Sequence, residues 1–165
     1  MEWNLVNAHP TGTPAPVLEK GELTLSGRAV QSRGTYTAPV TIECGLQPQP
    51  ATTNSAFYID LVPAGQPATA LPGDSWSIKL IHGQTLQVWA THGSQPTPLI
   101  EPVPLRAAAE GGYKLAVDVR RDGLEVRVNG ETVKVDKAMP FDEFHIELRS
   151  FPPPNSWRAS NFSVH

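Results

Sequence analysis

The chain has 165 residues, enough for one domain with its own hydrophobic core, and a single domain over residues 1–165 is expected. Its 17 prolines are roughly twice the average share of about 5%, which disfavours an all-α fold because proline is excluded from helix interiors. The net charge of −3, without any Lys/Arg cluster larger than a pair, argues against nucleic-acid binding.

The sequence does not predict a membrane protein either. Its longest apolar runs are a few residues, far short of the roughly 20 that a spanning helix needs. Residues 1–4 lack the basic and then apolar pattern of a secretory signal, so a cytoplasmic location is expected unless the natural chain was trimmed. The single cysteine, Cys44, excludes an internal disulfide and is predicted to fill the core.

The first part of the chain predicts strands separated by proline-rich loops. Residues 1–16 are expected to be irregular, because four of the last seven are proline or glycine. Alternation of polar and apolar residues predicts strands at 22–25 and 36–44. A polar loop is expected at 47–54, followed by a strand at 55–62.

Further along, residues 75–81 and 85–91 predict a hairpin around His82-Gly83-Gln84. The proline-rich segment 93–104 is expected to be a loop, and 105–111 no more than a helical turn. Strands are predicted at 113–120, 124–128 and 132–135, the last two joined at Asn129-Gly130, which is typical of a tight hairpin turn. Strands at 144–151 and 159–164 complete a chain of about ten strands, as in a sandwich or barrel.

The C-terminal half resembles a known superfamily. Residues 112–130, with strands on either side of Asp122-Gly123 and a closing Asn129-Gly130, resemble a recurring segment of concanavalin A-like (laminin G-like) jelly rolls. The closing segments 146–149 and 159–164 resemble the final strands of the 3-keto-disaccharide hydrolase group within it. The resemblance is best over 112–165 and implies an all-β, antiparallel two-sheet β-sandwich. It does not specify an activity, because this fold hosts lectins, glycosidases and adhesive modules.

The alternation within the strands predicts which side chains face outwards. Apolar residues such as Ile59, Val88 and Ile146 are assigned to the core, and their polar or aromatic neighbours to the outside. An exposed aromatic ring can stack on sugar C–H groups while carboxylates and amides bond the hydroxyls. If these strands are neighbours, the candidate ligand-binding residues are Tyr58, Asp60, Trp89, His145, Glu147 and Arg149.

The tryptophans have competing interpretations. Trp89 is either a ligand-binding residue or packed under the loop at 93–104. Trp157 is either a ligand-gripping aromatic or a plug at the end of the sandwich. Trp76 is predicted to be core, because it alternates with Ile78 and Leu80, and Trp3 to pack the N-terminal segment onto the body.

Glu143 and Glu147 are the candidate catalytic residues. Their segment resembles the Glu-x-Asp-x-(x)-Glu strand of retaining β-glucanases, whose acids line one face of the sheet. His145 stands where that motif has aspartate, and the segment lies near the C-terminus rather than mid-chain, so catalysis of this type is not favoured.

No other catalytic motif and no cofactor fingerprint is visible, and the five histidines have no spacing typical of a metal site. The leading function is therefore non-catalytic recognition of a carbohydrate or another small polar ligand. The alternatives are a glycoside hydrolase or lyase of the 3-keto-disaccharide hydrolase group, and a structural module that forms a homo-oligomer or binds a protein.

Overall fold

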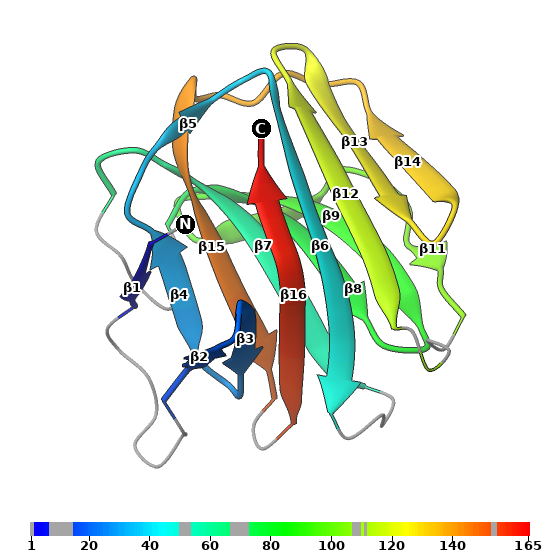
Figure 1. Ribbon diagram of the computed structural model, residues 1–165. Helices are drawn as coiled ribbons and strands as arrows, with labels where there is room; N and C mark the ends of the chain where they lie inside the picture. The colour runs from blue at the N-terminus through cyan, green and yellow to red at the C-terminus, as the bar shows by residue number, and fades with distance from the viewer. Residues whose placement is uncertain are drawn as a thin grey trace.

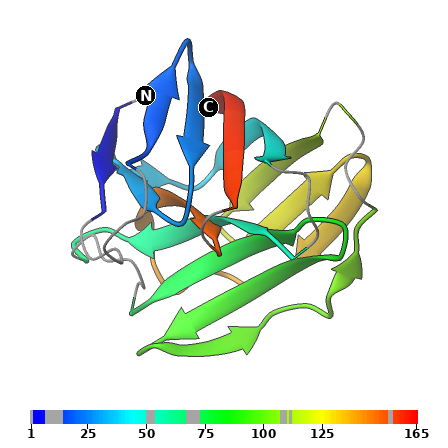
Figure 2. The same cartoon turned by 90° about the horizontal axis from the view of Figure 1, so that it is seen from below.

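The computed structural model describes residues 2–6, 15–49, 54–66, 73–106, 110, 112–152 and 155–165. Within these ranges the regular structure consists of β-strands, and no helix long and apolar enough to cross a membrane occurs there. The strands form two antiparallel sheets packed face to face, with the smaller sheet in front in Figure 1 and both layers visible from below in Figure 2. The predicted all-β sandwich is confirmed.

In the described part of the chain nine strands form the larger sheet, in the order β1-β4-β15-β7-β8-β9-β10, with β11 beside β9 and β5 beside β15. Its strands are β1 (Trp3–Leu5), β4 (Ala29–Ser32), β5 (Tyr36–Thr37), β7 (Ala56–Pro63), β8 (Ser75–Ile81), β9 (Thr85–His92), β10 (Gln95–Pro98), β11 (Val103–Pro104) and β15 (Glu143–Phe151).

The other sheet has seven described strands in the order β14-β13-β12-β6-β16-β3-β2. They are β2 (Val17–Glu19), β3 (Glu22–Leu25), β6 (Val40–Gln49), β12 (Tyr113–Arg120), β13 (Gly123–Val128), β14 (Glu131–Val135) and β16 (Ser156–Val164). β6 and β16 lie side by side at its centre, so segments more than a hundred residues apart in sequence are direct neighbours.

The core lies between the sheets and follows the period-two pattern. Ile59 on β7 and Ile146 on β15 meet Ile42 on β6 and Val117 on β12 across the interface, each with at most 1% of its surface exposed. Cys44 belongs to the same cluster, and burial raises the pKa of its thiol to about 12. Its predicted role as core filler is confirmed.

The hairpin at the end of the seven-stranded sheet has the predicted turn. Val128 pairs with Glu131, which leaves Asn129 and Gly130 as the two turn residues. Their φ angles are +48° and +92°, as a type I′ turn requires. The Asn129 side chain also accepts a hydrogen bond from the backbone N–H of Lys114 at 2.7 Å, which attaches the turn to β12.

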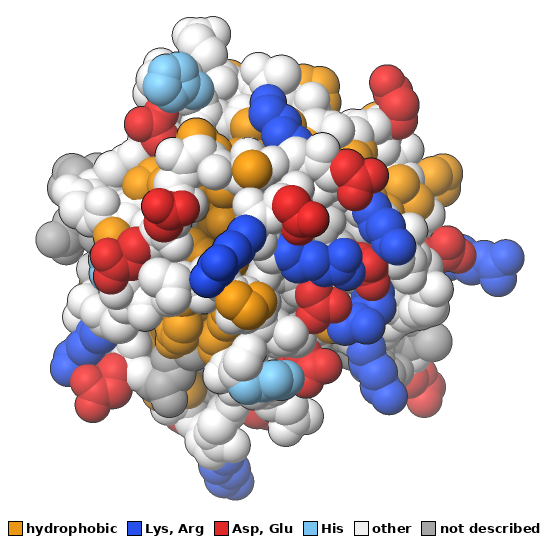
Figure 3. All heavy atoms as spheres, turned by 90° about the horizontal axis from the view of Figure 1, so that it is seen from above, with side chains coloured by type: hydrophobic (Ala, Val, Ile, Leu, Met, Phe, Trp, Pro, Cys, Tyr) orange, Lys and Arg blue, Asp and Glu red, His pale blue; other side chains and the backbone are white. Residues whose placement is uncertain are grey.

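The outer side of β12–β14 carries interleaved charges. Glu125 contacts Arg120 at 2.8 Å and Lys134 at 3.5 Å, while Arg127 contacts Asp118 at 2.9 Å. The view from above shows acidic and basic side chains mixed in the same way (Figure 3). These charges form ion pairs between neighbouring strands.

Several short edge strands were not predicted. Residues 3–5 form β1, and the segment 93–104 contains β10 and β11 instead of a continuous loop. Prolines 96, 98 and 104 are compatible with these strands because each pairs on one side only, at the margin of the sheet. β2 and β4 were also missed, β6 runs on to Gln49 into the predicted loop, and most of the helical turn predicted at 105–111 lies outside the described residues.

Candidate functional site

The predicted ligand-binding residues occupy neighbouring strands of the nine-stranded sheet. β15 pairs with β7, β7 with β8, and β8 with β9. The core residues of these strands alternate with the predicted ones, so the latter share the side turned away from the seven-stranded sheet. We call this side the outer face, and it carries Tyr58, Asp60, Trp89, His145, Glu147 and Arg149.

The strand register arranges the outer face in two adjacent rows. The first, the Glu147 row, runs across five strands and contains Gln31, Glu147, Asp60, Ser77 and Trp89. The second, the Tyr58 row, contains Arg149, Tyr58, Lys79 and Gln87. Members of a row are direct cross-strand neighbours, which brings their Cβ atoms to about 5 Å from one another.

Asp60 and Arg149 form a two-point ion pair within the outer face. Arg149 Nε lies 2.5 Å from Asp60 Oδ2, and Arg149 Nη2 lies 3.3 Å from Oδ1. The Asp60 side chain is fully buried, whereas 20% of the Arg149 side chain is exposed. The guanidinium also lies over the ring of Tyr58, 4.0 Å from its centroid. Arg149 therefore neutralises a buried carboxylate and keeps one edge toward solvent.

Glu147 lies directly opposite Asp60 but has no such partner. Its side chain is fully buried, and neither carboxyl oxygen has a hydrogen-bond partner; the same is true of Nε2 of the neighbouring Gln31. Burial and, to a smaller extent, the negative charge of Asp60 raise the pKa of Glu147 to about 8, while Arg149 and the neighbouring Gln31 side chain oppose the rise. The carboxyl group is consequently neutral at pH 7.

A hydrogen-bonded ladder follows the outward side of β9. Trp89 Nε1–H donates to Gln87 Oε1 at 3.0 Å, and Gln87 Nε2 donates to Thr85 Oγ1 at 3.0 Å. All three side chains are partly exposed. The bond to Gln87 fixes the plane of the indole ring, so Trp89 is a preoriented aromatic surface. The part of the segment 93–104 opposite Trp89 is strand β10, which pairs with β9 at Pro98.

His145 and Glu143 lie toward the other end of β15. His145 Nδ1 is 3.1 Å from the carbonyl oxygens of both Ser32 and Gly34, so this nitrogen must carry the proton and donate. Glu143 is exposed and accepts a hydrogen bond from Thr35 Oγ1. Glu143 and Glu147 are four positions apart on β15, which separates their backbones by about 13 Å. Glu143 is exposed whereas the Glu147 side chain is fully buried, so the two acids do not share one accessible site.

Sequence patterns missed four members of the outer face. Lys79 and Ser77 could have been found, because they alternate with Ile78 and Leu80 on a predicted strand. Gln87 was recognised as outward but not as a candidate. Gln31 belongs to β4, which was not predicted, and only its pairing with β15 places it beside Glu147.

The remaining tryptophans are structural. Trp157 is fully buried in β16, where its ring centroid lies 5.8 Å from that of Phe57 and 6.0 Å from that of Tyr113. Its interpretation as a ligand-gripping aromatic in a loop is wrong, and the plug is correct. Trp76 is core, as predicted, and Trp3 packs edge-on against Phe162, with ring centroids 5.2 Å apart.

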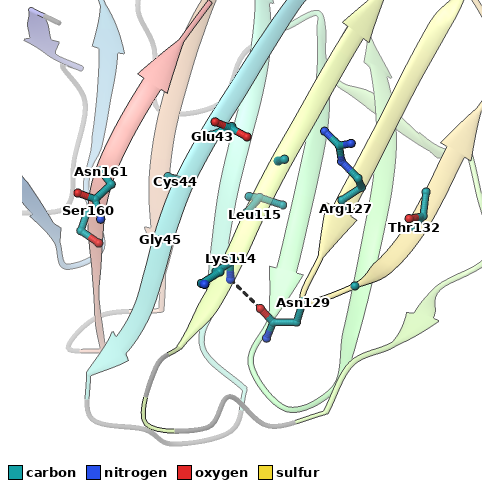
Figure 4. Close-up of a pocket in the computed structure, with 12 residues that line it drawn as sticks. Glu43, Cys44, Gly45, Lys114, Leu115, Arg127, Asn129, Thr132, Ser160 and Asn161 are labelled. Carbon is teal, nitrogen blue, oxygen red and sulfur yellow. Dashed lines mark hydrogen bonds between the residues drawn. The ribbon is translucent and has the colours of Figure 1, made fainter.

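A hollow lies on the opposite side of the molecule from the outer face. It is a groove of about 680 Å³ over β6, β12, β13, β14 and the bulged part of β16 (Figure 4). The small residues Gly45 and Ala116 contribute to its floor, and Glu43, Lys114 and Arg127 lie around it. The described residues that line it include no aromatic side chain, so they offer no stacking surface of the kind that the outer face has in Trp89.

Comparisons with known proteins were made at the level of sequence and of structure. No protein-family model and no curated protein matches the sequence. Among solved structures, the chain is similar to the carbohydrate-binding module CBM66 from Bacillus subtilis, with a TM-score of 0.73 and 9% identity over 99% of this chain and 94% of that one.

Two further structures have the same architecture. A prokaryotic β-1,3-1,4-glucanase (lichenase) from a mouse hindgut metagenome has a TM-score of 0.70 and 15% identity, over 98% of this chain and 91% of that one. Sheep galectin-11, in complex with glycerol, has a TM-score of 0.59 and 10% identity, over 82% and 95% respectively. The narrower resemblance to the 3-keto-disaccharide hydrolase group stays a prediction. The chain has the concanavalin A-like jelly-roll fold.

Proposed function

We propose that the outer face of the nine-stranded sheet binds carbohydrate and does not catalyse its hydrolysis. The observation that carries this proposal is the placement of Trp89 beside Gln87 and Lys79 on two adjacent strands, all partly exposed. A preoriented indole offers its apolar face to a sugar ring, and an amide and an ammonium group beside it bond the hydroxyls.

A third aromatic side chain, besides Trp89 and Tyr58, extends the same face. Phe151 at the end of β15 is 58% exposed and alternates with the buried Ser150, which places it on the side of Arg149. An accessible aromatic ring can stack on a sugar, and three of them on one sheet face suit a chain of sugar rings. The similarity in fold to a carbohydrate-binding module and to a galectin supports the proposal.

A hydrolase is the second candidate, and one observation favours it. Glu147 and Asp60 are cross-strand neighbours, one neutral at pH 7 and the other paired with Arg149, as a general acid and a nucleophile would be. Both side chains, however, are fully buried, so neither carboxyl group reaches a bound sugar. This burial is why binding without catalysis is preferred.

A glycan array tests the proposal. The wild-type protein is expected to bind at least one class of glycan, and Trp89→Ala is expected to reduce that binding roughly two- to tenfold, because a stacked aromatic contributes about 0.5–1.5 kcal/mol. Leu18→Ala is the matched control, since Leu18 is 60% exposed but lies on β2 of the other sheet.

Two results would overturn the proposal. The first is no binding to any glycan, and the second is binding that Trp89→Ala leaves unchanged. Hydrolysis of aryl glycosides by the wild type that is lost in Glu147→Gln would favour the enzyme instead. Self-association without glycan binding, measured by sedimentation, would favour the structural module.

A further inference from the structure

The Tyr58 row carries two cationic groups on either side of one aromatic residue. Arg149 and Lys79 are the cross-strand neighbours of Tyr58 on β15 and β8. The Arg149 guanidinium lies 4.0 Å, and Lys79 Nζ 5.4 Å, from the centroid of the Tyr58 ring. Tyr58 thus lies between the two cations and contacts both through its ring, and an anion beside it is attracted by both charges.

Lys79 is not balanced by an acidic group of the outer face. Asp60 is committed to Arg149, and Glu147 is neutral at pH 7. Glu143 lies about 13 Å along β15 from Glu147, where it is bonded to Thr35. Among the described residues, no ion pair involves Lys79. The face therefore has an excess positive charge at the Tyr58 row.

Both cations retain donors for a ligand. Arg149 uses Nε and Nη2 on Asp60, and no hydrogen bond from its Nη1 to another described residue occurs. Lys79 is partly exposed, and its ammonium group has three donors. An anion placed here gains two charge-assisted hydrogen bonds, which are about twice as strong as neutral ones. A neutral hydroxyl in the same place would gain less.

We propose that the carbohydrate bound on the outer face is acidic, and that Lys79 and Arg149 hold its carboxylate or sulfate group beside Tyr58 while Trp89 stacks on a sugar ring. This inference rests on the proposed function and deepens it by naming the class of ligand. A uronate carboxylate and a sulfate ester share the required chemistry: a compact anion with two or more acceptor oxygens attached to a sugar.

Calorimetric titration with two matched pairs of sugars tests the inference. One pair is an oligogalacturonate and its methyl ester, and the other is a sulfated galactan oligosaccharide and its desulfated form, so each pair differs in charge alone. At least one acidic sugar is expected to bind tenfold or more tightly than its neutral partner, and the advantage should shrink at 0.5 M NaCl. The pair that shows the preference identifies the anion as carboxylate or sulfate.

Lys79 variants test whether the preference for the acidic sugar comes from the Tyr58 row. Lys79→Gln keeps a polar, unbranched side chain, one atom shorter, and removes the charge, so the preference for the acidic sugar should fall roughly tenfold. Lys79→Arg keeps the charge and should retain most of the preference. Both side chains suit a partly exposed position, and thermal melting checks that the variants are folded.

The outcomes separate this inference from the proposed function. If both neutral sugars bind as tightly as their acidic partners, and Trp89→Ala still weakens binding, carbohydrate binding stands and the acidic ligand is wrong. An acidic preference that survives in Lys79→Gln overturns the assignment to this row. If none of the four sugars binds while the array shows a neutral glycan bound through Trp89, the acidic ligand is again wrong. If no glycan binds on the array and none of the four sugars binds in the titration, the proposed function itself is overturned.

Discussion

Glu147 and Asp60 face each other directly across β15 and β7, and only Asp60 has a cationic partner. Both side chains are fully buried on the outward side of their sheet. The two carboxyl groups therefore differ in charge at neutral pH: the Arg149 guanidinium compensates the charge of Asp60, whereas burial and the nearby Asp60 keep Glu147 protonated. This difference has consequences for stability and for binding.

Stability should depend on pH through Glu147. Between pH 4.5 and about 8 the folded state holds the Glu147 proton and the unfolded chain has lost it, so the free energy of unfolding falls as pH rises, by up to roughly 1.4 kcal/mol per unit. Glu147→Gln removes this slope. In urea denaturation at pH 5, 7 and 9, the free energy of unfolding of Glu147→Gln should rise relative to that of the wild type with each step in pH.

Glu43→Gln is the matched control for this series, because Glu43 is an exposed glutamate on β6. The free energy of unfolding of Glu43→Gln should vary with pH as that of the wild type does. A stability difference between Glu147→Gln and the wild type that is the same at all three pH values would contradict a raised Glu147 pKa.

The Asp60–Arg149 pair should respond unequally to loss of either partner. Arg149→Met leaves a fully buried carboxylate without a counterion, and a cost of about 3–5 kcal/mol in the free energy of unfolding is expected. Asp60→Asn should cost less, because the Arg149 side chain is already 20% exposed and can turn toward water. Equal losses in chemical denaturation, or a larger loss for Asp60→Asn, would contradict the burial described here.

Tyr113 joins the core to the hairpin between β8 and β9. Its hydroxyl lies 2.7 Å from Nδ1 of the buried His82, accepts a hydrogen bond from Gly83 N–H at 3.0 Å, and is 3.3 Å from the carbonyl oxygen of Arg106. Tyr113→Phe keeps the ring and removes all three contacts, so a loss of about 1–3 kcal/mol is expected. Thermal melting provides the measurement, and an unchanged melting temperature would show that these contacts are not stabilising.

Binding of an acidic sugar should weaken above pH 8. Ionisation of Glu147 adds a negative charge beside Asp60 and Arg149, which opposes an anion at the Tyr58 row. The dissociation constant is expected to rise between pH 7 and 9 in the wild type and to stay level in Glu147→Gln. Calorimetry at both pH values distinguishes this effect from ionisation of the sugar, which is complete at pH 7. Parallel curves for the two proteins would exclude Glu147 as the cause.

Local sequence signals predicted the centre of both sheets. The alternation at 55–62 requires only the strand itself, and the turn at Asn129-Gly130 requires only two residues that tolerate positive φ. Strands that are short or that pair on one side only were harder to predict from the sequence. β10 has four exposed residues, two of them proline, and its pairing with β9 leaves no periodic apolar pattern in the sequence.

The candidate site was only partly predictable, because register is a long-range property. Outward positions on β7, β9 and β15 follow from alternation, and six residues of the outer face were named on that basis. That Glu147 lies opposite Asp60, and Gln31 beside Glu147, depends on the pairing of strands that are far apart in the chain. The burial of these carboxyl groups, on which the proposal of binding without catalysis rests, is likewise absent from any local pattern.

The central claim, that carbohydrate binds on the outer face of the nine-stranded sheet, is tested most directly by nuclear magnetic resonance. A glycan that binds on the array is titrated into labelled protein, and changes in backbone amide and indole Nε1–H signals are followed. Binding on the outer face predicts the largest changes at β8 and β9 and at the Trp89 indole, with the buried Trp157 indole unaffected. Changes confined to the groove around Gly45 and Lys114 on the other sheet would contradict the claim.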